Sequence, residues 1–180
     1  MNIRSIQASV IALALSTAAG LATAKDHDDE RGEARDPLVG TWQVRVTPYV
    51  CGSDPIVTLP QNTVDWYVTF GAGGTLLETN SNPRFMPGQR SPGHGHWERV
   101  GRRTYAAALQ AFIQFTTEPF TPAGYLRGTQ RFDMEIELVD ADRWTSIADR
   151  WTSLAVVTFH DSGGNKYRSG CAVSEAVRMP

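Results

Sequence analysis

Residues 126–138 read LRGTQRFDMEIEL, and apolar and polar side chains alternate along this stretch. A strand here would carry on one face Leu126, Gln130, Phe132, Met134, Ile136 and Leu138. Its other face would carry Arg127, Thr129, Arg131, Asp133, Glu135 and Glu137. A period of two is typical of a half-buried β-strand, whereas a helical period would scatter the acidic residues around the surface. The stretch therefore predicts a strand with one face in the core and one face in water.

The same alternation recurs along the rest of the chain. It predicts strands at Leu38–Val50, Val64–Phe70, Thr75–Asn80, Trp97–Val100, Thr104–Phe115, Leu154–His160 and Lys166–Arg178. The run Ala106–Ala108 is also compatible with a helix, but its β-branched and aromatic surroundings favour a strand. Most connections are short and rich in Gly, Asn or Asp, as in hairpins.

The count of eight or nine strands, without a convincing helix, predicts an all-β fold. A sheet of this kind must remove its exposed edges, which favours a closed up-and-down antiparallel β-barrel. An open β-sandwich is the competing architecture. The longest connection is Ser81–Gly95, which is rich in Pro and Gly and is a candidate for the rim of a binding site.

The N-terminus has the three-part pattern of a secretory signal peptide. A short region with Arg4 precedes an apolar stretch from Ile6 to Leu21, and Ala22-Thr23-Ala24 forms a small-residue cleavage site. A membrane anchor is the alternative, but the stretch is short and rich in Ala and Ser. We expect residues 1–24 to be removed and the protein to be exported, either periplasmic or secreted.

The mature chain divides into a leader and one domain. Residues 25–36 hold six acidic and three basic residues and no large apolar one, which predicts a disordered acidic leader. Residues 37–180 would form the barrel domain. Loss of Arg4 with the signal takes the formal net charge from −2 to −3. This weakly acidic balance argues against a nucleic-acid partner, and no later segment is apolar enough to span a membrane as a helix.

A tandem copy precedes the last hairpin. The segment Ala141–Ile147 (ADRWTSI) is followed at once by Ala148–Leu154 (ADRWTSL). A repeat of seven residues would put Trp144 and Trp151 on opposite faces of an unbroken strand. We therefore expect a break near Ala148 and Asp149.

Cys51 and Cys171 are the two cysteines of the chain. Export to an oxidising compartment favours a disulfide between them, and two free buried thiols are the alternative. No zinc-ligand spacing surrounds either residue.

Gly40-Thr41-Trp42 at the start of the first strand resembles the G-x-W signature of lipocalins and related calycin barrels. The resemblance implies that Trp42 closes the barrel floor and that Arg178, near the end of the last strand, packs across it. The chain is also similar to small exported bacterial barrel proteins of unassigned function, through Gly74–Glu78, Ser91–Trp97 and Asp161–Asn165. The T-D-Y-x-x-Y element of lipocalins is missing.

A register argument supports closure of the barrel. If Trp42 faces Arg178 and Cys51 faces Cys171, both pairs imply nearly the same antiparallel register between the first and last strands. The two implied registers differ by a shift of one residue on each strand. Both registers leave every side chain on its own face. The first and last strands are therefore expected to be neighbours, as a closed barrel requires.

Few residues indicate catalysis or metal binding. His94 and His96 could form a metal pair on a strand, but the neighbouring prolines and glycines suggest a loop, and no third ligand is evident. Parity predicts that Asp65 and Glu98 point outward, whereas the direction of Glu78 stays open. No nucleophile elbow, phosphate loop or dinucleotide fingerprint is present, and we expect neither a metal nor a cofactor.

Three functions remain open: a barrel that binds a small apolar ligand, a barrel enzyme of the cyclase or isomerase type, and a structural or interaction protein with a filled core. We favour ligand binding, with no prediction of oligomeric state. The pocket is expected at the end opposite Trp42 and Arg178. The candidate ligand-binding residues are Val68, Phe70, Phe85, Met86, His94, Phe132 and Met134.

Overall fold

Eight strands run through the parts of the chain that the computed structural model describes, which are residues 36–114, 125–139 and 149–180. The strands are β1 (Gly40–Tyr49), β2 (Val64–Phe70), β3 (Thr75–Asn80), β4 (Gly93–Arg99), β5 (Thr104–Ile113), β6 (Gly128–Leu138), β7 (Arg150–Asp161) and β8 (Lys166–Arg178). One short 3₁₀ helix, η1 (Pro60–Asn62), precedes β2. The described residues thus form an all-β domain, as the alternation predicts.

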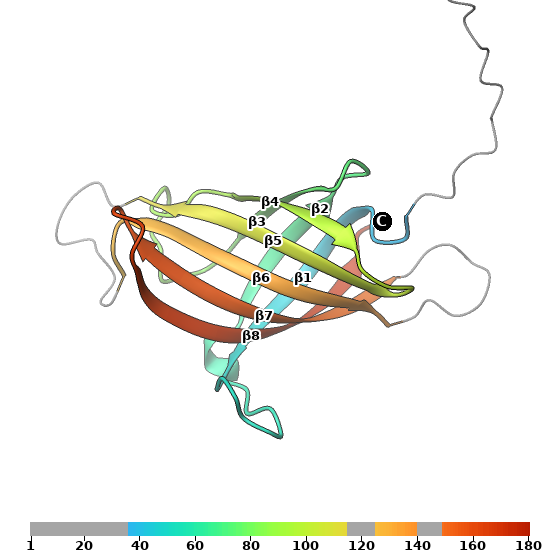
Figure 1. Ribbon diagram of the computed structural model, residues 1–180, viewed down its shortest axis with the longest axis horizontal. Helices are drawn as coiled ribbons and strands as arrows, with labels where there is room; N and C mark the ends of the chain where they lie inside the picture. Colours follow the sequence, from blue (N-terminus) through green and yellow to red (C-terminus); the bar gives the residue numbers. More distant parts are fainter. Residues whose placement is uncertain (1–35, 115–124, 140–148) are drawn as a thin grey trace, which may run out of the picture. The chain divides into compact units, whose positions relative to one another are not determined.

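The strands form a closed barrel in which each pairs antiparallel with the next along the chain (Figure 1). β8 pairs with β1 and closes the ring, in a register that runs from Trp42–Arg178 to Tyr49–Cys171. The closed up-and-down barrel is confirmed, with eight strands, and an open sandwich is ruled out. The run Ala106–Ala108 lies within β5 and is strand, as its surroundings favour.

The pleat places alternate side chains inside the barrel, and β6 shows this most clearly. Phe132, Met134, Ile136 and Leu138 are buried, and the charged residues between them face outward. The prediction for Leu126 is wrong, because this residue is 49% exposed. β6 begins only at Gly128, where a Cβ would lie 2.0 Å from the carbonyl oxygen of His160, so the close approach to β7 starts at this glycine.

Aromatic side chains fill one end of the barrel, which we call the floor. Trp42 and Trp151 meet edge to face with ring centroids 6.1 Å apart, and Phe70 contacts both Trp151 and Trp97 in the same manner. Trp97 in turn contacts Tyr105. All five side chains are buried, so this end of the barrel is solid.

The segment 36–39 closes the floor from below. Trp42 Nε1 donates to the Leu38 carbonyl over 2.9 Å, and the Arg178 guanidinium lies over the Trp42 ring, 4.1 Å from its centroid. Arg178 also donates to the carbonyls of Pro37 and Val39. The contact between Trp42 and Arg178 that the resemblance implies is therefore present.

Asp36, which the sequence assigned to the leader, is bound to the floor. Its Oδ1 accepts hydrogen bonds from the Leu38 N–H and the Tyr105 hydroxyl, and its Oδ2 lies 3.2 Å from Arg99 Nε. Burial raises the pKa of Tyr105, and the neighbouring Asp36 raises it further. Asp36 is therefore packed against the barrel, although the sequence assigned it to the leader.

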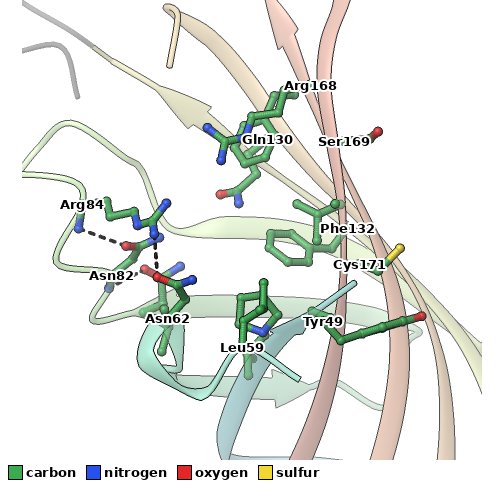
Figure 2. Close-up of a pocket in the computed structure, with 18 of the residues that line it drawn as sticks. Tyr49, Leu59, Asn62, Asn82, Arg84, Gln130, Phe132, Arg168, Ser169 and Cys171 are labelled. Carbon is green, nitrogen blue, oxygen red and sulfur yellow. Dashed lines mark hydrogen bonds between the residues drawn. The ribbon is translucent and has the colours of Figure 1, made fainter. Parts of the chain in front are cut away.

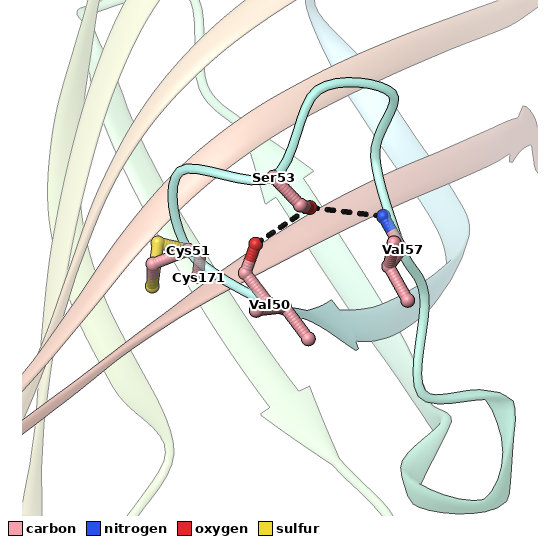
Figure 3. The surroundings of a disulfide bond; sticks show 5 residues. All are labelled: Val50, Cys51, Ser53, Val57 and Cys171. Carbon is pink, nitrogen blue, oxygen red and sulfur yellow. Dashed lines mark hydrogen bonds between the residues drawn. A yellow bond between two sulfur atoms is a disulfide. The ribbon is translucent and has the colours of Figure 1, made fainter.

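The Cys51–Cys171 disulfide is present and ties the end of β1 to β8, with 5.3 Å between the two Cα atoms (Figure 3). Cys51 starts the loop that leads to η1. Ser53 Oγ orders this loop by donating to the Val50 carbonyl over 2.7 Å and accepting from the Val57 N–H over 3.0 Å. Among the described residues no cysteine is free.

Some predictions fall on residues that the structure does not describe. The signal peptide 1–24, most of the leader and the first member of the tandem repeat, Ala141–Ile147, lie outside the described ranges. The second member supplies the start of β7, with Trp151 turned inward. In the ranges that are described, no helix is both long and apolar enough to cross a membrane.

Candidate functional site

A cavity of about 260 Å³ lies at the end of the barrel opposite the floor. β1 and β7 border it with their C-terminal ends, and β2 and β8 with their N-terminal halves. Its apolar wall includes Val46, Val64, Trp66, Phe132, Val157 and Phe159. Trp66 and Phe132 meet edge to face with centroids 4.7 Å apart, so the base of the cavity is rigid and aromatic.

Small residues on β8 leave this end hollow. Gly170 pairs with Val157, whose side chain is turned inward, and an added Cβ at Gly170 would meet no atom within 4 Å. The next inward position is Ala172. At the floor the corresponding inward residues include tryptophans, and the difference in side-chain volume explains why one end is filled and the other is open.

Polar side chains form the opposite wall of the cavity. Arg84 Nη2 donates to Asn62 Oδ1 over 2.6 Å, and the Arg84 N–H donates to Asn82 Oδ1 over 3.0 Å. The Asn82 N–H donates to Asn80 Oδ1 over 3.1 Å. Figure 2 shows Arg84, Asn82 and Asn62 on one side of the cavity and Phe132 on the other. The cavity is therefore amphipathic.

A buried ion pair stands behind the polar wall. Arg90 comes from the connection between β3 and β4 and places Nη2 2.8 Å from Glu78 Oε2, with side chains that are 5% and 0% exposed. Asn80 Nδ2 donates to the other carboxylate oxygen, Oε1, over 2.7 Å. Arg90 Nε donates to Gln130 Oε1 over 2.6 Å. This network links β3 to β6 across the interior of the barrel.

Stacked aromatic residues form the outer edge of the cavity. The Arg168 guanidinium carbon lies 4.7 Å from the Tyr125 ring centroid and 5.7 Å from that of Phe159. Phe85 packs on the other side of Tyr125, with centroids 5.0 Å apart. Phe85, one of the seven predicted ligand-binding residues, thus supports a cavity residue and is not itself part of the lining.

Among the other predicted residues, Phe132 lines the cavity directly. Val68 and Met134 are buried in the middle of the barrel, beneath the cavity. Phe70 was expected near the open end, but it pairs with Gly40 and lies in the floor. The reason is strand direction: β2 runs antiparallel to β1, so its last residue lies where β1 begins.

Met86 and His94, the two remaining predicted residues, do not line the cavity. Met86 is 54% exposed and does not line the cavity. His94 and His96 lie on β4, where their side chains face outward. The glycines beside them occupy inward positions: a Cβ at Gly93 would lie 2.5 Å from Glu78 Oε2, and one at Gly95 would lie 1.9 Å from the Ala108 carbonyl oxygen. These glycines allow close packing in a strand and do not form a loop.

The sequence missed Glu78, Arg90 and Gln130 as parts of the site. A signal existed for two of them, because Gln130 stands alone as a polar residue on the apolar face of β6 and Glu78 shares the inward parity of Leu76. Arg90 gave no such signal, since it lies outside any strand and reaches the interior only through the fold. Asp65 and Glu98 face outward, as parity predicts.

No family model, curated protein or solved structure matches this chain. The site has to be interpreted from its geometry. The described residues that line the cavity include no carboxylate or histidine, and in the described part of the chain no group of three or more His, Cys, Asp or Glu is placed to hold a metal ion. Both Glu78 oxygens are engaged by Arg90 or Asn80. The titratable side chains in the described lining are those of Tyr49, Tyr125, Arg84 and Arg168.

Larger hollows also occur on the outside of the barrel. One of about 470 Å³ is bordered by Glu135, Glu137 and Glu175, whose side chains face outward and are exposed. This hollow lies on the outer face of the sheet, whereas the cavity of about 260 Å³ lies inside the barrel.

Proposed function

We propose that this protein binds a small, largely apolar molecule in the open end of its barrel. The observation that carries the proposal is the contrast between a solid aromatic floor and a cavity of about 260 Å³ that has one apolar and one polar wall. Its volume is slightly below the range of about 300–1,000 Å³ that is usual for ligand pockets. A ligand of one or two rings is therefore expected.

The likeness to lipocalins supports this proposal. The G-x-W start, the Arg178 guanidinium over Trp42 and the eight-stranded closed barrel are the features that the chain shares with that family. Barrels of eight strands can be filled by side chains or can hold one small ligand. This chain combines the two arrangements, one at each end.

We further propose that the protein is exported after removal of residues 1–24. The Cys51–Cys171 disulfide supports export, because such bonds persist in oxidising compartments. The intact mass of protein recovered from outside the cytoplasm is expected to correspond to a chain that starts at Lys25. Recovery of the full chain from the cytoplasm would contradict export.

Gly170 offers a direct test of the binding site. The substitution Gly170→Phe would place a ring in empty space inside the cavity without a clash at the Cβ. Binding of the apolar dye N-phenyl-1-naphthylamine, followed by fluorescence titration, is expected to fall at least about tenfold, because the ring occupies the ligand's volume. The matched control is Gly73→Phe, since Gly73 lies in the β2–β3 turn at the floor end and also has open space around its Cβ.

Equal dye binding by the native protein and Gly170→Phe would place the binding site elsewhere. No dye binding by the native protein would contradict the proposed function. Thermal unfolding of each variant, followed by circular dichroism, shows whether the barrel is intact in the titrations.

A further inference from the structure

The ion pair behind the cavity fixes the direction of one buried amide. Gln130 is 5% exposed, and its Oε1 accepts a hydrogen bond of 2.6 Å from Arg90 Nε. Arg90 is itself held by Glu78 through both of its terminal nitrogens. An arginine can only donate, so the oxygen of Gln130 must face Arg90, and its amide nitrogen must face away.

The amide nitrogen of Gln130 faces the cavity. Nε2 makes no hydrogen bond with the described residues, and Gln130 lines the cavity together with Phe132 from the same strand (Figure 2). The buried side-chain atoms without a partner in the described part of the chain are Trp151 Nε1 and Ser153 Oγ. Gln130 Nε2 has no partner among the described residues and is not among these buried atoms, so it is accessible from the cavity. A donor therefore points into the cavity.

The geometry points to a ligand with a carbonyl oxygen on an apolar body, held by Gln130 Nε2. This inference rests on the proposed binding function and adds the chemistry of the head group. A buried donor gains from an acceptor, and a ligand without one would leave it unpaired.

Two compounds of the same shape test the inference. 2-Acetylnaphthalene carries a C=O where 2-isopropenylnaphthalene carries a C=CH₂, and the dissociation constants of both are measured by displacement of N-phenyl-1-naphthylamine. The dissociation constant of the olefin is divided by that of the ketone. Because both compounds share the same ring body, its contribution to binding cancels in this ratio. The substitution Gln130→Leu is expected to lower this ratio about three- to tenfold, which corresponds to loss of one neutral hydrogen bond.

A second variant and a control accompany this measurement. Gln130→Glu keeps an acceptor for Arg90 but replaces the donor with an oxygen, so the ratio should fall at least as far as in Gln130→Leu. The matched control is Gln110→Leu on the outer face of β5, where the ratio should stay at the native value.

The outcomes separate the two proposals. If both naphthalenes bind and the ratio is the same in native protein and Gln130→Leu, the carbonyl inference is wrong and the binding function stands. If neither naphthalene displaces the dye from the native protein, the proposed function fails, and the inference fails with it.

Discussion

Glu78 and Asp65 are both carboxylates on neighbouring strands, but they have opposite environments. Asp65 lies on the outer face of β2, 3.7 Å from Arg45, and both side chains are more than half exposed. Glu78 has no exposed side-chain surface and is paired with Arg90. Exposed pairs contribute little to stability, whereas breaking a buried pair leaves an uncompensated charge. A carboxylate therefore has very different energetic consequences on the two faces of one sheet.

This contrast predicts a strong coupling between Glu78 and Arg90. Each of Glu78→Leu and Arg90→Met is expected to lower the free energy of unfolding by about 3–5 kcal/mol, and the double variant should be more stable than either single one. Urea denaturation of the four proteins measures the coupling. The control cycle uses Arg45→Met and Asp65→Leu, whose coupling should be below about 1 kcal/mol. Additive losses at Glu78 and Arg90 would show that the pair does not act as a unit.

At the scale of elements, the β7–β8 hairpin depends on its turn. Asp161 Oδ1 accepts hydrogen bonds of 2.9 Å from the N–H groups of both Gly163 and Asn165. Gly164 has a φ of +82°, a conformation that glycine adopts without strain. The pairing of β7 with β8 shifts register beside this turn, since Phe159 pairs with Arg168 but His160 pairs with Lys166. The turn thus sets the register that places Gly170 opposite Val157.

The turn predicts a pH dependence of stability. The hydrogen bonds from Asn165, first from its backbone and then from its side chain, hold the pKa of Asp161 below its ordinary value of 3.8. A lowered pKa in the folded state adds stability above the unfolded pKa, and this stability is lost as the pH falls through the folded pKa. The difference in urea midpoint between native protein and Asp161→Ala should be constant above about pH 5 and shrink below 3.8.

The neighbouring turn residue provides the control for this prediction. Ser162 is exposed, so Ser162→Ala should change the urea midpoint little and equally at every pH. A midpoint difference for Asp161→Ala that is the same at pH 3 and pH 7 would contradict the assignment to the carboxylate.

For the whole molecule, the disulfide fastens the closing seam of the barrel. Cys51 and Cys171 are 120 residues apart, so their bond closes most of the domain into one loop. The chain-entropy model gives such a bond about 3–5 kcal/mol. β1 and β8 also pair from Trp42 to Tyr49 without it, so the barrel should form in its absence.

The double variant Cys51→Ser/Cys171→Ser is therefore expected to fold with a lower free energy of unfolding, by about 3–5 kcal/mol. Far-ultraviolet circular dichroism checks the fold, and urea denaturation measures the loss. The native protein under reducing conditions should show the same loss, which serves as the control. Equal stability of native protein and variant in oxidising buffer would contradict a stabilising disulfide.

The sequence by itself determined the strands, their order and the closure of the barrel. Alternation along a strand is a local property, and each hairpin turn is contained within a few residues, so both can be found without the fold. The packing of Arg178 on Trp42 was predicted in another way, from the resemblance to lipocalins. The local pattern failed at His94, where glycines that permit close packing resemble the glycines of a loop.

Only the tertiary structure decided the size of the cavity and which residues line it, whereas its position opposite Trp42 and Arg178 was expected from the sequence. The volume inside a barrel depends on side chains from strands far apart in the sequence, and Gly170 and Ala172 leave space only because the facing strands do not fill it. Arg90 reaches Glu78 and Gln130 from a connecting segment whose path has no periodic signal. Strand periodicity is encoded residue by residue, whereas a cavity and a buried ion pair arise from groups that come together only when the sheet closes.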